Sequence, residues 1–175
     1  GGAIADAAVR AGRFVPPFRL TRMTWVKPSF LWLMARSNWG RKSGQERILA
    51  VRMTRTAWDG LLEHAVLTDP DRRVYAAGGE WARDNDTAEV RVQWDPERSL
   101  RGEKLAHRSI QVGIGRTLIA AYATDWIREI RDLTPTVRKM SELLAGGRAK
   151  DAKRFLPPER RYPVTATAAA RLGMN

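Results

Sequence analysis

The sequence predicts an α+β fold in which a small mixed or antiparallel sheet packs with several helices in a single domain. Three observations lead to this class. Short segments with a two-residue hydrophobic period are interspersed irregularly with helical segments, and the helical segments are the more numerous. A chain of 175 residues has the size of one ordinary domain, and no internal repeat divides it. Its 43% hydrophobic and 29% charged residues are typical of a globular protein.

Helix caps and strand patterns define the elements of the first 64 residues. Gly12 ends the first helix, and Ser29 and Thr54 are N-caps of the next two. The helix after Ser29 is apolar nearly all round, which predicts that it is buried. The expected elements are a helix over 4–12, a strand over 22–25, a helix over 30–38, a strand over 47–53 and a helix over 54–64.

The second part of the chain is expected to begin with a long polar loop over residues 68–86. Apolar side chains at every second position predict a strand over 89–94, and a second strand is expected over 109–112. The remaining elements are expected as a helix over 117–131, with Ile119, Tyr122, Trp126 and Ile130 on one face, and a helix from the N-cap Thr134 to Gly146. The domain is expected to span residues 1–163, followed by a loosely structured C-terminal tail over 164–175.

Composition excludes several classes of function. The chain has no cysteine, which excludes disulfides and thiolate chemistry, and its two histidines, His64 and His107, are too few for a histidine-rich metal site. No apolar run approaches the roughly 20 residues that a membrane span requires, and the N-terminus lacks the pattern of a secretion signal. We therefore expect a cytoplasmic protein with no metal and no membrane partner.

The net charge of +12 is distributed unevenly. Residues 1–55 carry 11 Lys and Arg against two acids, residues 56–100 carry five against ten, and residues 101–175 carry 15 against seven. Two basic flanks around an acidic middle suit a partner with phosphates, so a nucleotide or a nucleic acid is expected. An Arg-rich solvated surface without such a partner explains the charge about equally well.

The first candidate site is the stretch over residues 21–39, in which tryptophans lie among cations. Trp25, Lys27 and Arg36 are expected to line a pocket for an anionic, ring-bearing ligand, because cations neutralise phosphate while an indole stacks on a ring. Ser29 begins the next helix, and the partial positive charge of that N-terminus would add to the site. The alternative is that the tryptophans are core residues and the cations are solvated, which burial preferences favour for a single tryptophan.

The second candidate site is the end of the strand over residues 89–94. Gln93 and the two acids that follow it, Asp95 and Glu97, are placed for polar chemistry at the rim of a cleft, with Gln93 on the ligand-binding side. Glu97 would stabilise a developing oxocarbenium ion or orient a ribose hydroxyl. The alternative is an exposed Asp-Pro turn without a functional role. The sequence alone favours this alternative.

A third candidate is the pair Gly113 and Gly115, which lies between the strand over 109–112 and the predicted helix after it. Strand, Gly-x-Gly and helix begin a dinucleotide-binding pattern, but Leu118 takes the position of the third glycine and no βαβ unit is evident. Two alternatives remain equal. One is a helix start that binds phosphate, with Arg116 in its first turn, and the other is a simple turn.

Five stretches form one recognisable set: TRMTWVKPSFLW (21–32), QERILA (45–50), VRVQWDPER (90–98), RSIQ (108–111) and LPPERRYP (156–163). Together they resemble the domain-of-unknown-function family 4291. The resemblance spans nearly the whole chain and implies no settled activity. Members of the family have a strand before the first helix, so we expect such a strand upstream of residue 1.

The layout is also similar to that of compact ADP-ribosyltransferases, with an early helix, a mixed core and a late strand that carries Gln and Glu. This similarity implies NAD as the cofactor, Glu97 or Gln111 as the catalytic residue, and Trp25, Lys27 and Ser29 on the NAD side. The leading hypothesis is a nucleotide-binding, ADP-ribosyltransferase-like enzyme acting on nucleic acid or a nucleotide. The alternatives are a non-enzymatic nucleic-acid-binding module that uses the basic flanks, and a structural or partner-binding domain.

Overall fold

The computed structural model describes residues 1–75 and 78–174 and confirms the α+β class. The described helices are all too short or too polar to traverse a lipid bilayer. In chain order the elements are α1 (Gly2–Ala11), β1 (Thr24–Val26), α2 (Phe30–Ser37), β2 (Leu49–Met53), α3 (Arg55–His64), β3 (Val66–Leu67), α4 (Gly78–Thr87), β4 (Val90–Arg98), β5 (Lys104–Ile114), α5 (Ile119–Ala121), the π-helical turn η1 (Tyr122–Trp126), β6 (Ile127–Asp132), α6 (Thr134–Ala145), α7 (Ala149–Lys153) and α8 (Ala166–Arg171).

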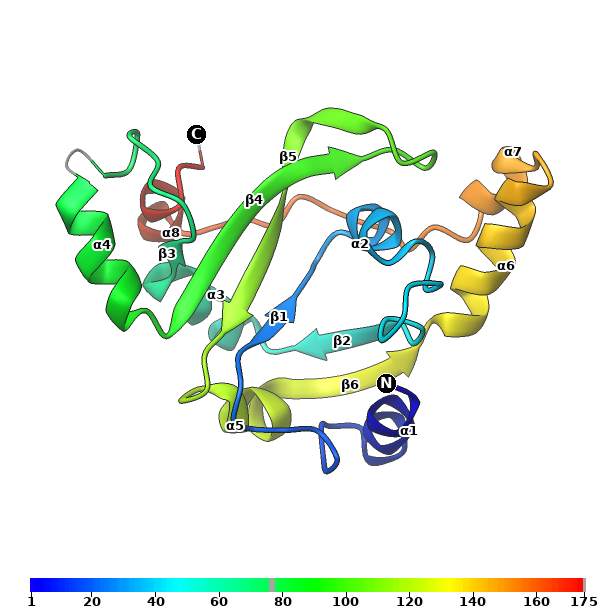
Figure 1. Ribbon diagram of the computed structural model, residues 1–175, viewed down its shortest axis with the longest axis horizontal. Helices are drawn as coiled ribbons and strands as arrows, with labels where there is room; N and C mark the ends of the chain where they lie inside the picture. Colours follow the sequence, from blue (N-terminus) through cyan, green and yellow to red (C-terminus); the bar gives the residue numbers. More distant parts are fainter. Residues whose placement is uncertain (76–77, 175) are drawn as a thin grey trace.

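The described strands form two small sheets (Figure 1). Four strands in the order β1-β5-β4-β3 make a mixed sheet, in which only the β3–β4 pair is parallel. Strands β2 and β6 form a separate antiparallel pair. The long β4–β5 hairpin runs through the middle of the molecule, and α2 lies between it and the β2–β6 pair (Figure 1).

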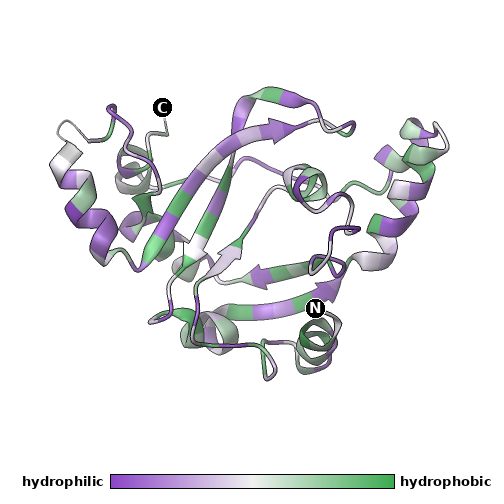
Figure 2. Ribbon diagram, viewed as in Figure 1, coloured by the Kyte–Doolittle hydropathy of each residue, from purple (hydrophilic) through white to green (hydrophobic). Residues whose placement is uncertain are grey.

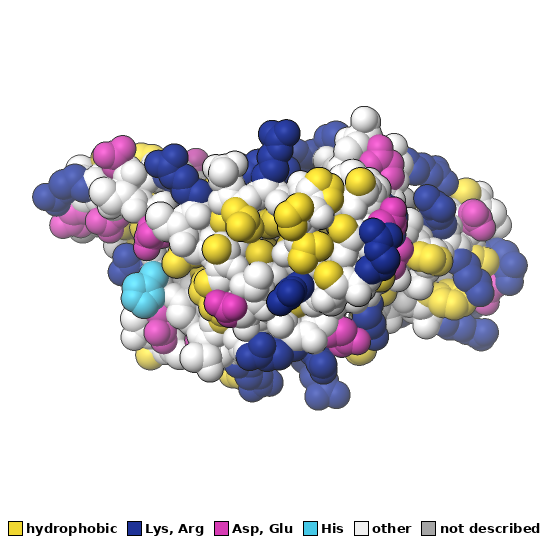
Figure 3. Space-filling view, turned by 90° about the horizontal axis from the view of Figure 1, so that it is seen from below, with side chains coloured by type: hydrophobic (Ala, Val, Ile, Leu, Met, Phe, Trp, Pro, Cys, Tyr) yellow, Lys and Arg dark blue, Asp and Glu magenta, His cyan; other side chains and the backbone are white. Residues whose placement is uncertain are grey.

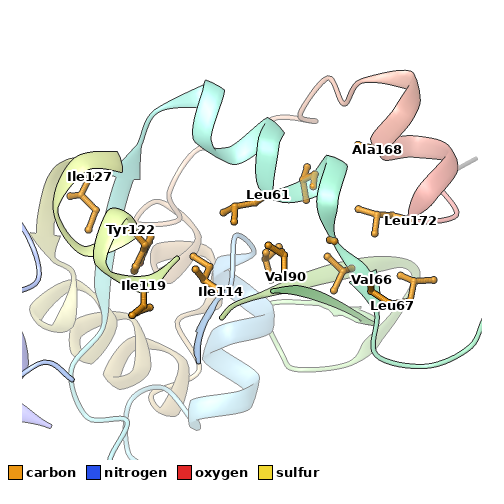
Figure 4. Close-up of a cluster of buried hydrophobic side chains, with 14 of the residues drawn as sticks. Leu61, Val66, Leu67, Val90, Ile114, Ile119, Tyr122, Ile127, Ala168 and Leu172 are labelled. Carbon is orange, nitrogen blue, oxygen red and sulfur yellow. The ribbon is translucent and has the colours of Figure 1, made fainter. Parts of the chain in front are cut away.

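The main hydrophobic core covers one face of the four-stranded sheet. Figure 4 shows side chains from α3, β3, β4, β5, η1 and α8 meeting there. The alternation predicted for β4 is confirmed, since Val90 and Val92 are buried in this core while Arg91 and Gln93 lie on the opposite face. A second cluster packs α2 against α6 through Phe30, Met34, Ile48, Val137 and Met140. Helix α2 is therefore buried by a core of its own, as its apolar sequence predicts.

The predicted helix starts are largely confirmed. Ser29 and Thr54 are the N-caps of α2 and α3, with side-chain oxygens that accept from Trp32 N and Ala57 N. Thr134 differs by one position, because it is the first residue of α6 and Leu133 is the N-cap. The Thr134 hydroxyl instead accepts from Ile48 N at 3.0 Å and joins α6 to the start of β2.

The helix predicted over residues 117–131 is wrong in its second half. The chain is helical only to Trp126 and then forms β6, which pairs with β2 from Met53–Ile127 to Leu49–Asp132. Ile127 and Ile130 are buried in the main core from this strand. Both are β-branched, and the edge of β2 supplies the main-chain partners, so tertiary pairing overrides the helical spacing.

Two segments expected to be irregular contain helices. Residues 78–87 of the expected polar loop form α4, which is hydrophilic along most of its length (Figure 2) and so lacks the apolar face that predicts a helix. The expected tail beyond residue 163 contains α8, which is anchored in the core. Leu172 is fully buried, its carbonyl accepts from the Trp94 indole at 2.9 Å, and the Arg171 guanidinium donates to Ala65 O.

Candidate functional site

A cleft of about 800 Å³ lies on the face of the four-stranded sheet opposite the main core. Its walls are α2, the tip of the β4–β5 hairpin and the junction of α6 with α7. This volume is within the range of small-molecule binding sites. The cleft is therefore the candidate functional site.

The floor of the cleft is a hydrogen-bonded cluster of Gln93, Asp95 and Gln111. Gln93 and Gln111 are directly opposed in the β4–β5 register, and Asp95 is two residues further on the same face. Gln111 Nε2 donates to Asp95 Oδ2 at 2.7 Å, and Gln93 Nε2 lies 3.2 Å from both carboxylate oxygens. The cluster thus fixes one carboxylate in the cleft, and Asp95 forms no ion pair within residues 1–75 and 78–174.

Three arginines surround this floor from different elements. Arg36 comes from α2, while Arg98 and Arg101 come from the hairpin tip. None of the three forms an ion pair with the described part of the chain, and the only side-chain hydrogen bond found among them runs from Arg98 Nη1 to Gly102 O at 3.1 Å. Positive charge that faces a concave surface without a counter-charge favours an anionic ligand.

Trp32 and Trp39 add apolar surface to the cleft from the two ends of α2. Trp32 is 5% exposed, and Trp39 packs edge-on against Phe30 with ring centroids 6.3 Å apart. Asn38 and Trp39 have φ angles of 50° and 54°, and Trp39 N donates to Met34 O at 2.8 Å. Left-handed backbone at two successive non-glycine residues is strained, and such strain is often concentrated at binding sites.

Trp25 lies on β1 and Lys27 directly follows this strand, and neither residue lines the cleft. Trp25 is opposite Gly113 in the β1–β5 register, so both residues are on the sheet face that carries Gln111. Lys27 Nζ donates to Trp25 O at 3.2 Å. Burial lowers the pKa of Lys27, and the nearby charge of Arg36 lowers it further. Lys27 is therefore a partly buried amine close enough to Arg36 for the two groups to repel each other when both are charged.

Ser29 has a structural role, and the N-terminus of α2 already has an anionic partner. The Ser29 hydroxyl accepts from Trp32 N at 3.1 Å, as expected of an N-cap. Phe30 N donates to Glu159 Oε1 at 2.8 Å, across 129 residues of sequence. The positive end of the helix is therefore satisfied by the protein's own carboxylate, and the prediction that Ser29 faces a ligand gains no support from the geometry.

Glu97 does not join the polar floor. The β4–β5 register shifts between Pro96 and Arg98, and the Glu97 carboxylate accepts from the N–H of Arg98 at 2.7 Å. Proline cannot donate to the ladder, which explains a bulge at this point. The bulge ends the alternation that would have placed Glu97 beside Gln93 and Asp95. Asp95 is consequently the carboxylate that lines the cleft.

The glycines at 113 and 115 allow close packing, not a phosphate-binding turn. A Cβ at Gly113 would lie 3.0 Å from the Trp25 ring, and one at Gly115 would lie 2.5 Å from Glu89 O. Gly115 N donates to the same carbonyl at 2.7 Å. Gly113 lies within β5 between β1 and β4, Gly115 directly follows β5, and neither glycine lines the cleft.

The family model for the domain of unknown function DUF4291 matches residues 2–162. The chain belongs to the DUF4291 family. This match confirms the family resemblance seen in the sequence, whereas the similarity of layout to ADP-ribosyltransferases stays a prediction. No curated protein and no solved structure shows a significant match to the chain.

In this DUF4291 protein the structure brings together three of the predicted site residues, Arg36, Gln93 and Gln111. Sequence reasoning did not assign a binding role to Arg98, Arg101 or Trp39, and it placed Asp95 only generally, in polar chemistry at the rim of a cleft. Alternation along β4 is a signal for Asp95, since it shares a face with Gln93. No local pattern indicates that the hairpin tip folds back over α2, so Arg98 and Arg101 had no comparable signal.

Two further observations on the DUF4291 domain concern metal ions and nucleic acid. Residues 1–75 and 78–174 contain no group of three His, Asp or Glu side chains arranged to hold a metal ion. Figure 3 shows the face formed by α1 and β6, where Lys and Arg side chains lie around the periphery with Asp and Glu among them and hydrophobic side chains occupy the centre. This face presents no continuous basic track of the kind that follows a nucleic-acid backbone.

Proposed function

We propose that the protein binds a small phosphorylated, nucleotide-like ligand in the cleft between α2, the β4–β5 hairpin and α6–α7. The observation that carries the proposal is a set of three arginines around a concave surface, Arg36, Arg98 and Arg101, none of which has an ion-pair partner among the residues that the structure describes. Arginine is well suited to phosphate because its planar guanidinium donates two parallel hydrogen bonds. Three guanidinium groups on two separate elements match a diphosphate ligand better than they match a ligand with a single carboxylate.

Trp39, which follows α2, supports a ligand that also carries a ring. It lines the same cleft as the arginines and is partly exposed, whereas Trp32 is only 5% exposed. Stacking of a base on an indole contributes about 1–3 kcal/mol and depends little on the identity of the base. The combination of cations with aromatic surface is therefore the reason for proposing a nucleotide and not inorganic phosphate alone.

NAD is one ligand of this class, and an NAD-dependent transfer is the enzymatic form of the proposal. Its pyrophosphate would lie among the arginines of the rim, and its nicotinamide ribose would lie on the floor beside Gln111. Catalysis would then depend on Gln111 and on the neighbouring Asp95, because the Glu97 carboxylate is hydrogen-bonded to its own main chain. Release of nicotinamide from NAD is the assay for this form.

Titration calorimetry with pyrophosphate, ADP and NAD tests the proposal. We expect wild-type protein to bind these ligands, and Arg36→Ala to weaken the binding about tenfold or more, since one charge-assisted contact contributes about 1.5–3 kcal/mol. The matched control is Arg83→Ala, which removes an exposed arginine from α4 at the opposite end of the molecule. It should leave the affinities unchanged.

Two results would contradict the proposal. The first is the absence of binding by all three ligands, and the second is an equal loss of affinity in both variants, which would indicate an effect of net charge only. Binding of a short oligonucleotide that ignores Arg36→Ala would favour the non-enzymatic nucleic-acid-binding alternative.

A further inference from the structure

The hydrogen-bonding groups of the cleft floor restrict the choice of ligand more than the charge of the floor does. A carboxylate only accepts hydrogen bonds, so the amide nitrogens of Gln93 and Gln111 must be the groups that face Asp95. The carbonyl oxygen of each amide is then directed away from Asp95. The floor therefore combines these oxygens with the remaining lone pairs of the carboxylate and is rich in acceptors.

Ser109 extends this polar cluster below the surface. It is directly opposite Asp95 in the β4–β5 register and lies on the same face of the sheet. The residue is 5% exposed, and its Oγ has no hydrogen-bond partner among the described residues. Buried hydroxyls are nearly always hydrogen-bonded in folded proteins, so the polar floor is not satisfied within itself.

The floor and the rim of the cleft thus favour opposite kinds of ligand group. The arginines of the rim are donors with positive charge, whereas the floor offers acceptors and one negative charge. A phosphate is repelled by Asp95 and attracted by Arg36, Arg98 and Arg101. A ligand that fits both ends has phosphate at one end and hydrogen-bond donors at the other.

We propose that Asp95 is the specificity-determining residue of the cleft and that it binds two adjacent hydrogen-bond donors at the non-phosphate end of the ligand. The vicinal diol of a ribose and the imino and amino groups of guanine both present such a pair to a carboxylate. This inference rests on the proposed function and adds the orientation of the ligand, with phosphates at the rim and donors at the floor.

Asp95→Asn is the substitution that tests this role. It keeps the size of the side chain but removes the charge and replaces one acceptor oxygen by an amide donor, which would face the donors of the ligand and the amides of Gln93 and Gln111. Asp86→Asn, at an exposed position on α4, makes the same chemical change away from the cleft and is the matched control.

Calorimetry with pyrophosphate, GDP, ADP and 2′,3′-dideoxy-ADP distinguishes the two donor pairs. If the diol is bound, wild-type protein binds GDP and ADP alike and dideoxy-ADP at least tenfold more weakly. If the guanine edge is bound, GDP binds at least tenfold more tightly than ADP, and the loss of the diol has no effect. In either case Asp95→Asn weakens the preferred ligand at least tenfold and does not weaken pyrophosphate binding, because it removes a charge that repels phosphate.

The inference is overturned if Asp95→Asn binds every nucleotide as wild type does, or if pyrophosphate and nucleotide lose affinity equally. Wild-type protein alone also tests it, because equal affinity for GDP, ADP and dideoxy-ADP would exclude a bound donor pair even if the variant did not fold. Failure of wild type to bind pyrophosphate or any nucleotide would instead remove the proposed function and the inference with it.

Discussion

Replacement of Gly115 by alanine should destabilise the protein strongly, because the end of β5 approaches the main chain before β4 without room for a side chain. The new Cβ would lie 2.5 Å from Glu89 O, while a relaxed contact between carbon and oxygen is about 3.3 Å. The strands would have to separate by about 0.8 Å. The hydrogen bond from Gly115 N to Glu89 O, now 2.7 Å long, would be lost with that movement.

The expected cost is about 2–4 kcal/mol, with about 1–3 from overpacking and about 1 from the lost hydrogen bond. Urea unfolding followed by tryptophan fluorescence measures it, and at a slope of about 2 kcal/mol/M the midpoint should fall by about 1–2 M. Gly60→Ala is the control. Gly60 lies inside α3 with no atom within 4 Å of the added Cβ, so it should stabilise by about 0.5–1 kcal/mol.

A Gly115→Ala protein within about 0.5 kcal/mol of wild type would refute this reasoning. A variant of normal stability that lost affinity for pyrophosphate would also refute it, since that result would assign Gly115 to phosphate binding. Loss of stability with no separate effect on affinity is the result that close packing predicts.

Two further predictions concern stability. Leu172→Ala should lower the free energy of unfolding by about 2–4 kcal/mol, measured in urea, because Leu172 is fully buried. The control is Leu20→Ala, at a position 46% exposed, which should change stability by less than about 0.5 kcal/mol. Equal effects would mean that α8 is not part of the core. Burial alone would raise the pKa of Asp132, but hydrogen bonds from Thr134 and Arg47 lower it on balance. Stabilisation by a carboxylate of lowered pKa is present above the unfolded value of about 3.9 and is lost as the pH falls through the folded pKa. Arg47→Ala should therefore cost about 0.5–1 kcal/mol at pH 7 and progressively less below about pH 4, and a cost independent of pH would contradict this assignment.

Local patterns in the sequence predicted an element correctly where that element is determined by its own residues. The caps at Ser29 and Thr54 and the alternation of Val90, Val92 and Trp94 are short-range patterns, and the structure follows them. The switch from helix to strand at Ile127 could not be predicted in this way. Its cause is the edge of β2, which lies more than 70 residues earlier in the chain.

The candidate site likewise contains residues that the sequence indicates and contacts that only the tertiary structure creates. Gln93 was identified from its place at a strand end and Gln111 from the similarity of layout to ADP-ribosyltransferases, and their direct pairing in the register brings the two together. Glu97 was assigned from its place at the same strand end, but the bulge at Pro96 interrupts the alternation there. The contact of Glu159 with the N-terminus of α2 spans 129 residues, so no local pattern could indicate that this anion site is already filled.

A crystal structure of the protein with bound GDP tests the central claim most directly. The account predicts that the diphosphate lies among Arg36, Arg98 and Arg101 and that two donors of the nucleoside lie within hydrogen-bond distance of Asp95. A nucleotide bound outside this cleft, or bound in it with the phosphates against Asp95, would contradict the account.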